Sequence, residues 1–127
     1  MDYGRFTEFW SQQLNCMIGL YETKDPLKKL IGIVGIYSIQ YPERCELKRM
    51  WICEEHRRNG LGKVLLNSIL NEARKLNYKR VQLVTVFVLK DAIEFYLKND
   101  FKLTKELRFS AVLPFNYFYE LHLEKEL

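Results

Sequence analysis

The stretch from Arg57 to Lys63, Arg-Arg-Asn-Gly-Leu-Gly-Lys, combines residue types that suit the binding of a phosphate group. Its two glycines leave backbone amides open to close approach by a ligand. An apolar helical pattern begins at Leu61, so the free N–H groups and the positive end of a helix dipole should lie in the same place. With three basic side chains beside it, this stretch predicts a phosphate or pyrophosphate cradle. The alternative is a glycine-rich turn that only begins a helix.

Two familiar nucleotide-binding motifs do not fit this stretch. A Walker loop places Ser or Thr after Gly-Lys, whereas Val64 follows Gly62-Lys63, and Arg57 stands where the motif needs its first glycine. A dinucleotide fingerprint needs three glycines, and only two are present. The predicted cradle therefore belongs to another kind of site.

The elements before the loop must position it. Apolar residues at helical spacing predict one short helix within residues 1–15: Phe6, Phe9, Trp10 and Leu14. Residues 16–53 have the β-branched and alternating composition of antiparallel strands, expected at 16–22, 29–40 and 45–53. In the third strand, positions 45, 47, 49 and 51 should face one side of the sheet and positions 46, 48, 50 and 52 the other.

After the loop the apolar period becomes helical for about 16 residues from Leu61. The run 81–88 is nearly all apolar, which predicts a strand buried on both faces. Since a helix joins strand 45–53 to strand 81–88, we expect the two strands to be parallel neighbours.

A second, shorter helix should follow, with Asp91 as its cap and an end near Lys98. Residues 102–127 predict a C-terminal hairpin, with strands at 101–109 and 115–123. The whole chain of 127 residues is thus expected to form one domain with a mixed α/β sheet.

Two motifs of this chain resemble the signatures of the GNAT acetyltransferase family. Arg57, Gly60 and Gly62 match the family's Arg-x-x-Gly-x-Gly loop between a strand and a helix, and residues 46–52 resemble the strand that precedes it. Downstream, Ala92 and Tyr96, four residues apart ahead of Phe101, resemble the second signature. The resemblance covers residues 16–123. It implies an acyl-CoA N-acyltransferase fold in which segment 54–101 is the acetyl-CoA-binding core.

The resemblance also implies residue roles. Beside Arg57, main-chain amides would hold the pyrophosphate of acetyl-CoA, contributed by Arg58, Asn59, Gly60, Leu61, Gly62 and Lys63. The backbone of Met50 would polarise the thioester carbonyl, and the backbone of Ile52 would bind pantetheine.

Two side chains would carry the proton transfers. Tyr96 would protonate the departing thiolate, a task that suits a phenol because it keeps its proton at neutral pH. Glu46 stands where some family members place a carboxylate that accepts the amine proton, usually through water. The plainer alternatives are a core aromatic at Tyr96 and a solvent-facing strand residue at Glu46.

Some positions depart from the family pattern. Leu89 replaces an Asn that often stands three residues before the Ala of the second signature. Family members normally begin with a strand and two helices, and this sequence offers one short predicted helix before residue 16. A narrower resemblance to the camello-like branch rests on Glu46-Leu47-x-Arg49-Met50, on His56-Arg57 and on the absence of Asn at position 89.

Composition limits the other function classes. Three scattered cysteines, an odd number, indicate reduced thiols and a cytoplasmic or nuclear protein. We expect no metal, since Cys45 and Cys53 lie about 26 Å apart along one strand, and Cys53 with His56 is too small a ligand set. The sequence contains no apolar run long enough for a membrane helix and no pattern of a secretory signal at its N-terminus. We therefore expect no membrane partner.

Charge is unevenly spread along the chain. The segment from Arg44 to Arg80 contains ten Lys or Arg residues and four Asp or Glu residues, whereas the whole chain has a net charge of +4. This basic middle is either a solvated face or a site for an anionic ligand. No aromatic RNA-binding motif accompanies it, so we expect no nucleic-acid partner.

The leading hypothesis is an N-acetyltransferase in which a primary amine attacks acetyl-CoA directly in a ternary complex. One alternative is a CoA-binding or partner-binding module of the same fold with little catalysis. Another is a subunit completed by a second chain, with a homodimer as one form. The acceptor amine, a small molecule or a protein amine, is not encoded in these motifs.

Overall fold

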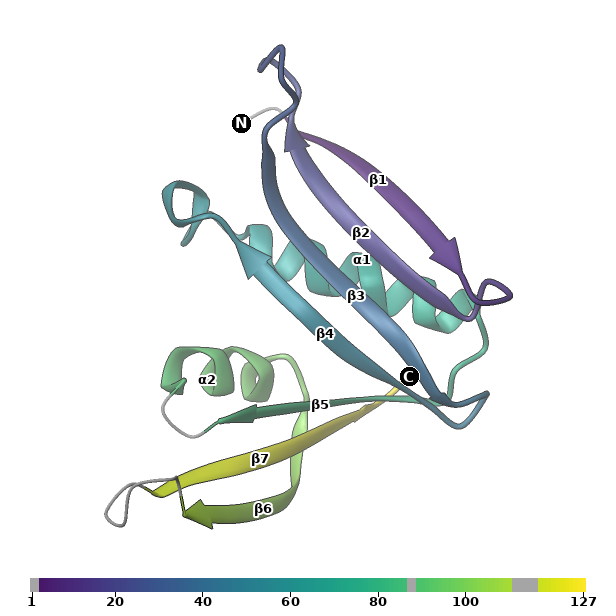
Figure 1. The fold of residues 1–127 in the computed structure, drawn as a ribbon, viewed down its shortest axis with the longest axis vertical. Coiled ribbons are helices and arrows are strands. Elements are labelled where there is room, and N and C mark those ends of the chain that lie inside the picture. The colour runs from purple at the N-terminus through teal and green to yellow at the C-terminus, as the bar shows by residue number, and fades with distance from the viewer. Residues whose placement is uncertain (1–2, 87–88, 111–116) are drawn as a thin grey trace.

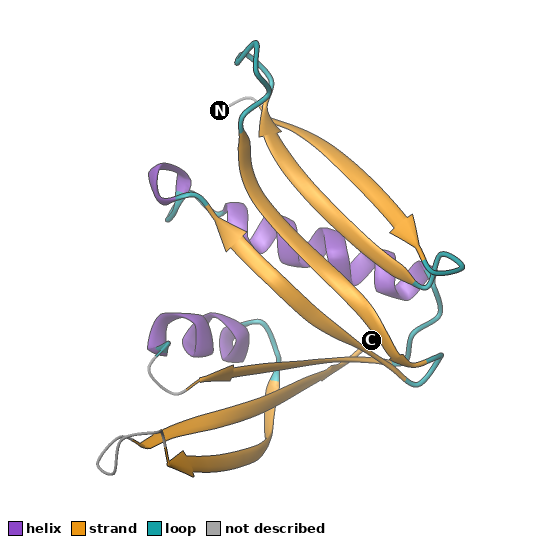
Figure 2. Cartoon of the chain, in the orientation of Figure 1, coloured by secondary structure: helices purple, strands orange, loops and turns teal. Residues whose placement is uncertain are grey.

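The computed structural model describes residues 3–86, 89–110 and 117–127. Its strands form one seven-stranded sheet in the order β1-β2-β3-β4-β5-β7-β6 (Figure 1). The elements are β1 (Tyr3–Trp10), β2 (Asn15–Glu22), β3 (Leu30–Gln40), β4 (Arg44–Ile52), the 3-10 turn η1 (Glu54–His56), α1 (Leu61–Lys75), β5 (Arg80–Val86), α2 (Lys90–Lys98), β6 (Lys102–Ser110) and β7 (Tyr117–Glu126). The predicted mixed α/β class is confirmed (Figure 2).

The N-terminal segment is a strand, so the helix predicted within residues 1–15 is wrong. β1 pairs antiparallel with β2 along its whole length, from Tyr3 opposite Glu22 to Trp10 opposite Asn15. The Phe6 ring lies directly over Gly19, where an added Cβ would clash with it. Aromatic side chains favour strands, and here pairing with β2 outweighs their helical spacing. Only the turn at residues 11–14 separates β1 from β2.

The middle of the chain follows the predicted order. β2, β3 and β4 are antiparallel neighbours, and α1 begins at Leu61 as expected. β4 and β5 are parallel, but their pairing is limited to three residue pairs, from Arg44 with Arg80 to Glu46 with Gln82. Beyond Glu46 the two strands separate (Figure 1).

The strand predicted at 81–88 differs in one respect. β5 lies between β4 and β7 in the sheet. Its Val81 and Leu83 side chains are buried, but its Val84 side chain is 41% exposed, so β5 is buried on one face only. Neither described helix covers Val84, because both lie on the other face of the sheet. Residues 87 and 88 of the predicted strand lie outside the described residues.

The second helix and the final hairpin largely match expectation. α2 begins at Lys90 after Leu89, so Asp91 lies in its first turn and is not its cap. β6 and β7 pair antiparallel, as predicted for the C-terminal hairpin. Positions 115 and 116, expected at the start of the last strand, lie outside the described residues. Among the described helices, none is long and apolar enough to cross a bilayer.

The hydrophobic core lies on one face of the sheet. α1 packs there on the alternate residues Cys16, Ile18 and Leu20 of β2, all fully buried. The same core includes Leu83 and Leu123, which face each other across β5 and β7, and Tyr96 of α2. Both helices therefore cover the same face.

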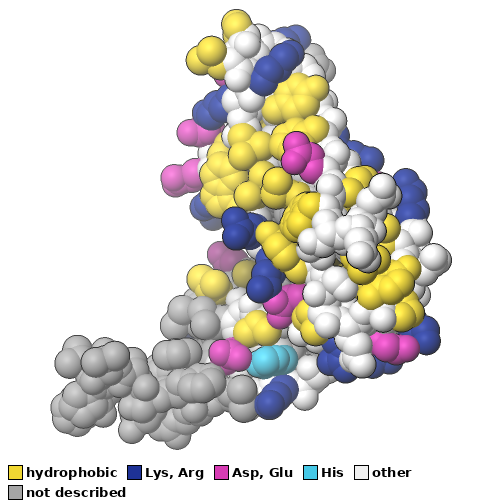
Figure 3. Space-filling model, turned by 45° about the vertical axis from the view of Figure 1, so that its right-hand side comes forward, with side chains coloured by type: hydrophobic (Ala, Val, Ile, Leu, Met, Phe, Trp, Pro, Cys, Tyr) yellow, Lys and Arg dark blue, Asp and Glu magenta, His cyan; other side chains and the backbone are white. Residues whose placement is uncertain are grey.

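No described helix covers the opposite face. Trp51 and Phe6 on that face are 42% and 36% exposed. Figure 3 shows hydrophobic side chains gathered over the part of the molecule built from β1 to β4. We call this side of β1–β4 the open face; it includes Phe6, Trp10, Met17, Tyr21, Tyr37, Glu46, Lys48 and Trp51.

Candidate active site

The loop between η1 and α1 has the backbone form of an anion-binding site. Arg58 and Gly60 adopt left-handed conformations, with φ of 65° and 78°. In the described part of the chain, the N–H groups of residues 58–63 donate to no other backbone group or side chain. Successive N–H groups at the positive end of a helix attract phosphate oxygens. Leu61 is buried and anchors the helix start, whereas Arg58, Asn59 and Lys63 are exposed.

Arg57 joins this loop to the end of β4. Its Nε donates a hydrogen bond of 2.9 Å to the carbonyl oxygen of Ile52. The bond fixes the loop beside the last residues of β4. Arg57 and Ile52, which the resemblance assigns separately to cofactor binding, are thus in direct contact.

A β-bulge at Arg49 changes which way β4 faces. Lys48 lies opposite Gly35 and Trp51 opposite Ile33, so β4 contains one residue more than β3 over this stretch. Arg49 has φ of 60°. The predicted alternation therefore holds for positions 45–48 and is wrong beyond them, because a bulge reverses the faces of the residues that follow.

The main chain of Met50 and Ile52 faces away from β3. The N–H of Cys53 donates to Ile31 of β3 at 2.9 Å. Because N–H groups alternate in direction along a strand, those of Ile52 and Met50 point to the other edge, where β5 has separated from β4. This edge is the one that a thioester carbonyl or a pantetheine amide would need to reach.

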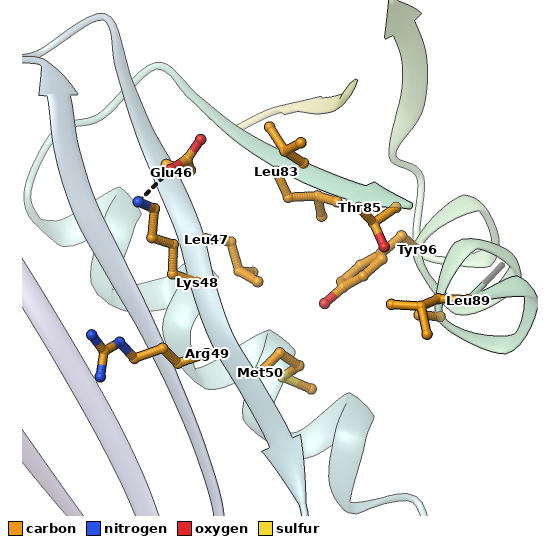
Figure 4. A pocket seen from close by; sticks show the side chains of 11 residues that line it. Glu46, Leu47, Lys48, Arg49, Met50, Leu83, Thr85, Leu89 and Tyr96 are labelled. Carbon is orange, nitrogen blue, oxygen red and sulfur yellow. Dashed lines mark ion pairs between the residues drawn. The ribbon is translucent and has the colours of Figure 1, made fainter. Parts of the chain in front are cut away.

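A cavity of about 620 Å³ occupies the gap between β4 and β5 (Figure 4). It is lined by Glu46, Leu47, Lys48, Arg49, Met50, Leu83, Val84, Thr85, Leu89, Ala92 and Tyr96. A second cavity of about 530 Å³ shares Met50, Ala92 and Tyr96 with it and extends to Arg57, Arg58 and Gly62. The two form one groove from Glu46 to the start of α1.

Tyr96 reaches the groove from the buried side. Its ring lies edge-on between Phe95 and Phe101, with ring centroids 5.4 Å away in each case. In Figure 4 its hydroxyl points toward the β4 side of the cavity. Burial raises the pKa of Tyr96 to about 12, so the phenol keeps its proton at neutral pH. Tyr96 is therefore a core aromatic residue whose protonated hydroxyl lies on the cavity wall.

Glu46 lies on the opposite wall and is engaged by two donors. Lys48 Nζ is 3.0 Å from Glu46 Oε2, and Gln82 Nε2 donates to Oε1 at 3.3 Å. The Glu46 side chain is only 17% exposed. It is therefore not the solvent-facing strand residue of the plainer alternative, and it lines the same cavity as Tyr96.

Two site residues were missed at the sequence level. Lys48 lies two positions after Glu46 on the same strand face, and that spacing was a usable signal for an ion pair. Phe95 lies 3.6 Å from the position of a Cβ added to Gly62. No local pattern indicated that contact, because it joins two helices that are distant in sequence.

The residues weighed as metal ligands gain a third member. The ligand atoms of Cys53, Glu55 and His56 lie within 4.8 Å of one another, and Glu55 was not considered at the sequence level. Lys29 Nζ already pairs with Glu55 at 3.1 Å. Cys45 is not part of this group, as its distance along β4 predicted.

Comparison with known families adds to this geometry. The model of the acetyltransferase (GNAT) family matches residues 2–101. Human N-acetyltransferase 8 is 32% identical over 81 residues, which are 61% of this chain and 36% of that protein. An uncharacterized N-acetyltransferase of Schizosaccharomyces pombe is 32% identical over 59% of this chain and 46% of its own length. The chain thus spans less than half of the length of each of these two relatives. The match to N-acetyltransferase 8 agrees with the resemblance to the camello-like branch.

Solved structures share the fold at low sequence identity. A GNAT family acetyltransferase from Elizabethkingia anophelis with acetyl-CoA bound aligns with a TM-score of 0.73 and 18% identity, over 89% of this chain and 76% of that one. The acetyltransferase of GNAT family from Streptococcus pneumoniae aligns with a TM-score of 0.75 and 19% identity, over 89% and 67%. These similarities establish the GNAT fold.

Proposed function

The chain belongs to the acetyltransferase (GNAT) family, and from that premise we propose that it transfers the acetyl group of acetyl-CoA to a primary amine. The observation that carries this proposal is the groove that joins the N–H groups of residues 58–63, which donate to no described group, to Glu46 and Tyr96. A groove with an anion cradle at one end and a base and an acid at the other suits a phosphorylated acyl donor.

The donor would be held mainly by backbone groups. The N–H groups of residues 58–63 bind the pyrophosphate, and Arg58 and Lys63 add positive charge there. The Met50 N–H polarises the thioester carbonyl and the Ile52 main chain binds the pantetheine arm. Because these are main-chain contacts, side-chain changes at Met50 and Ile52 should affect binding less than changes in backbone shape.

The proton transfers use the two walls of the cavity. Glu46 accepts a proton from the acceptor amine, directly or through a water molecule, because only the neutral amine is nucleophilic. The amine then attacks the thioester in a ternary complex. Tyr96 protonates the departing thiolate. An acid, a base and a carbonyl-polarising N–H are sufficient for this chemistry, and the proposal assigns no step to a metal ion.

Binding of acetyl-CoA is the first test. Acetyl-CoA at 1 mM should raise the melting temperature, since a ligand that binds only the folded state stabilises it by mass action. Arg58→Glu in the loop should abolish most of that shift. Arg74→Glu, the same charge change at the far end of α1, is the matched control and should retain it. The absence of a shift in the wild-type protein would disprove the proposal.

A CoA-binding module with little catalysis is the second candidate. It is favoured by the Lys48–Glu46 ion pair, which already occupies the candidate base, and by Leu89, which lines the cavity where Asn is common in the family. Acetyl-CoA binding without turnover over a panel of amines would support this candidate. Turnover that is lost in Glu46→Gln and Tyr96→Phe would reject it.

Assembly and location complete the proposal. A second chain would complete the acceptor side along the open face of β1–β4. This chain would be another copy of the protein or a different partner. Mass measurement during size-exclusion chromatography tests the homodimer directly. The three free cysteines, all buried, agree with a reducing cytoplasmic or nuclear compartment.

A further inference from the structure

One primary amine already lies in the candidate active site. Lys48 Nζ is 3.0 Å from Glu46 Oε2, the carboxylate proposed to take a proton from the acceptor. We propose that Lys48 is acetylated by its own chain, with acetyl-CoA as donor. This inference rests on the proposed function and adds to it a specific acceptor within the protein.

Position and exposure both favour Lys48. It lines the same cavity as Met50 and Tyr96, which the thioester would contact (Figure 4). Its side chain is 52% exposed, and its ammonium lies 5.6 Å from the centroid of the Tyr37 ring. In Figure 4 the ammonium lies beside Glu46 and points away from Tyr96. To reach the gap beside Met50, the flexible four-carbon stem must therefore rotate from Glu46 toward the cavity that Lys48 lines.

The reaction balances with acetyl-CoA as the only co-reactant. The Lys48 ammonium passes one proton to Glu46, and from there it goes to solvent. The neutral amine attacks the thioester carbonyl, so that a C–N bond forms and the C–S bond breaks. The thiolate takes a proton from Tyr96, and the second proton lost by the attacking nitrogen replaces it. The products are an amide at Lys48, CoA thiol and one released proton.

Acetylation would also change the site. It removes the positive charge of Lys48 and with it the ion pair to Glu46. One Glu46 oxygen then becomes available to a cationic acceptor. The modified chain should therefore accept cationic amines better than the unmodified one.

Lys29 provides a matched control. Its Nζ is 3.1 Å from Glu55 Oε2, and its side chain is 48% exposed, so its ion pair resembles that of Lys48. Lys29 lines neither cavity of the groove. Any chemical acetylation by free acetyl-CoA should modify the two lysines at similar rates.

The experiment follows site-specific acetylation by mass spectrometry. The full chain is incubated with acetyl-CoA, and peptides with Lys48 and Lys29 are quantified over time. We expect Lys48 to be acetylated at least tenfold faster than Lys29, at a rate independent of protein concentration. Lys48→Arg should remove the fast mass increase, Lys29→Arg should keep it, and Glu46→Gln should slow it about tenfold or more, each with its melting temperature checked.

The outcomes separate this inference from the proposed function. Equal rates at Lys48 and Lys29, or a rate that rises with protein concentration, would overturn self-acetylation. If acetyl-CoA binds and an added amine is acetylated while Lys48 stays unmodified, the proposed function stands and this inference fails. If acetyl-CoA does not bind to the wild-type chain, the proposed function itself fails.

Discussion

The two faces of β1–β4 are built from alternate residues of the same strands, yet they have opposite surroundings. On one face Ile18 and Leu20 are fully buried under α1. On the open face Phe6 and Trp51 remain 36% and 42% exposed, and Glu46 and Lys48 belong to that face. The difference suggests that the two faces have separate roles. The covered face contributes the packing that stabilises the fold, and the open face leaves space for an acceptor beside the candidate base.

The largest expected effect tests the covered face. Ile18→Ala removes fully buried methyl groups and should lower the free energy of unfolding by about 2–5 kcal/mol. Met17 is the half-buried neighbour of Ile18 on the open face, and Met17→Ala should lower the free energy of unfolding by about 1 kcal/mol or less. Urea denaturation measures both. Equal losses would mean that the open face is also packed in solution, for example against a second chain.

Tyr96 sharpens the comparison because it belongs to the covered core but reaches the cavity. Tyr96→Phe keeps the ring contacts with Phe95 and Phe101 and removes the proton donor. We expect kcat for acetyl transfer to fall about 100-fold at pH 7, while acetyl-CoA still raises the melting temperature. Tyr37→Phe on the open face is the control and should leave kcat within about twofold. A normal kcat in Tyr96→Phe would show that the thiolate is protonated by another group.

The buried thiols of the covered face predict a loss of stability in alkali. Burial raises the pKa of Cys45 to about 12, and burial followed by repulsion from Glu72 raises that of Cys16 to about 11. The folded state therefore favours the protonated thiols. This stabilisation is complete below the ordinary pKa of 9 and is lost as the pH rises through 11 and 12.

Cys45→Ala should accordingly flatten the fall in unfolding free energy by about 2 kcal/mol between pH 9 and pH 11. Met17→Ala removes no titrating group and should keep the wild-type slope. Urea denaturation at a series of pH values measures both slopes. An unchanged slope in Cys45→Ala would mean that the thiol ionises normally in the folded protein.

The comparison also explains which features could be predicted from sequence. The loop and α1 were predictable because Gly60, Gly62 and the helical apolar period are local signals. β1 was not, since its strand form depends on pairing with β2 and on the space that Gly19 leaves for Phe6. The sheet faces on which Met50 and Trp51 lie were also predicted wrongly, because the bulge at Arg49 is visible only in the register of β4 against β3. Of the candidate site, Glu46, Tyr96 and the loop before α1 were named from sequence, whereas Lys48 and Phe95 were not. The relation of these residues across the gap between β4 and β5 needed the tertiary structure.

The smallest expected effect lies at the edge of the open face. Lys28 Nζ lies 5.6 Å from the centroid of the Tyr21 ring, which is within the range of a cation–π contact worth about 0.5 kcal/mol at an exposed site. A double-mutant cycle with Lys28→Met and Tyr21→Leu should give a coupling free energy of that size by urea denaturation. Added salt should weaken it. A much larger coupling would mean that the two side chains are desolvated in solution, which would place a covering chain on the open face and change the proposed route of the acceptor.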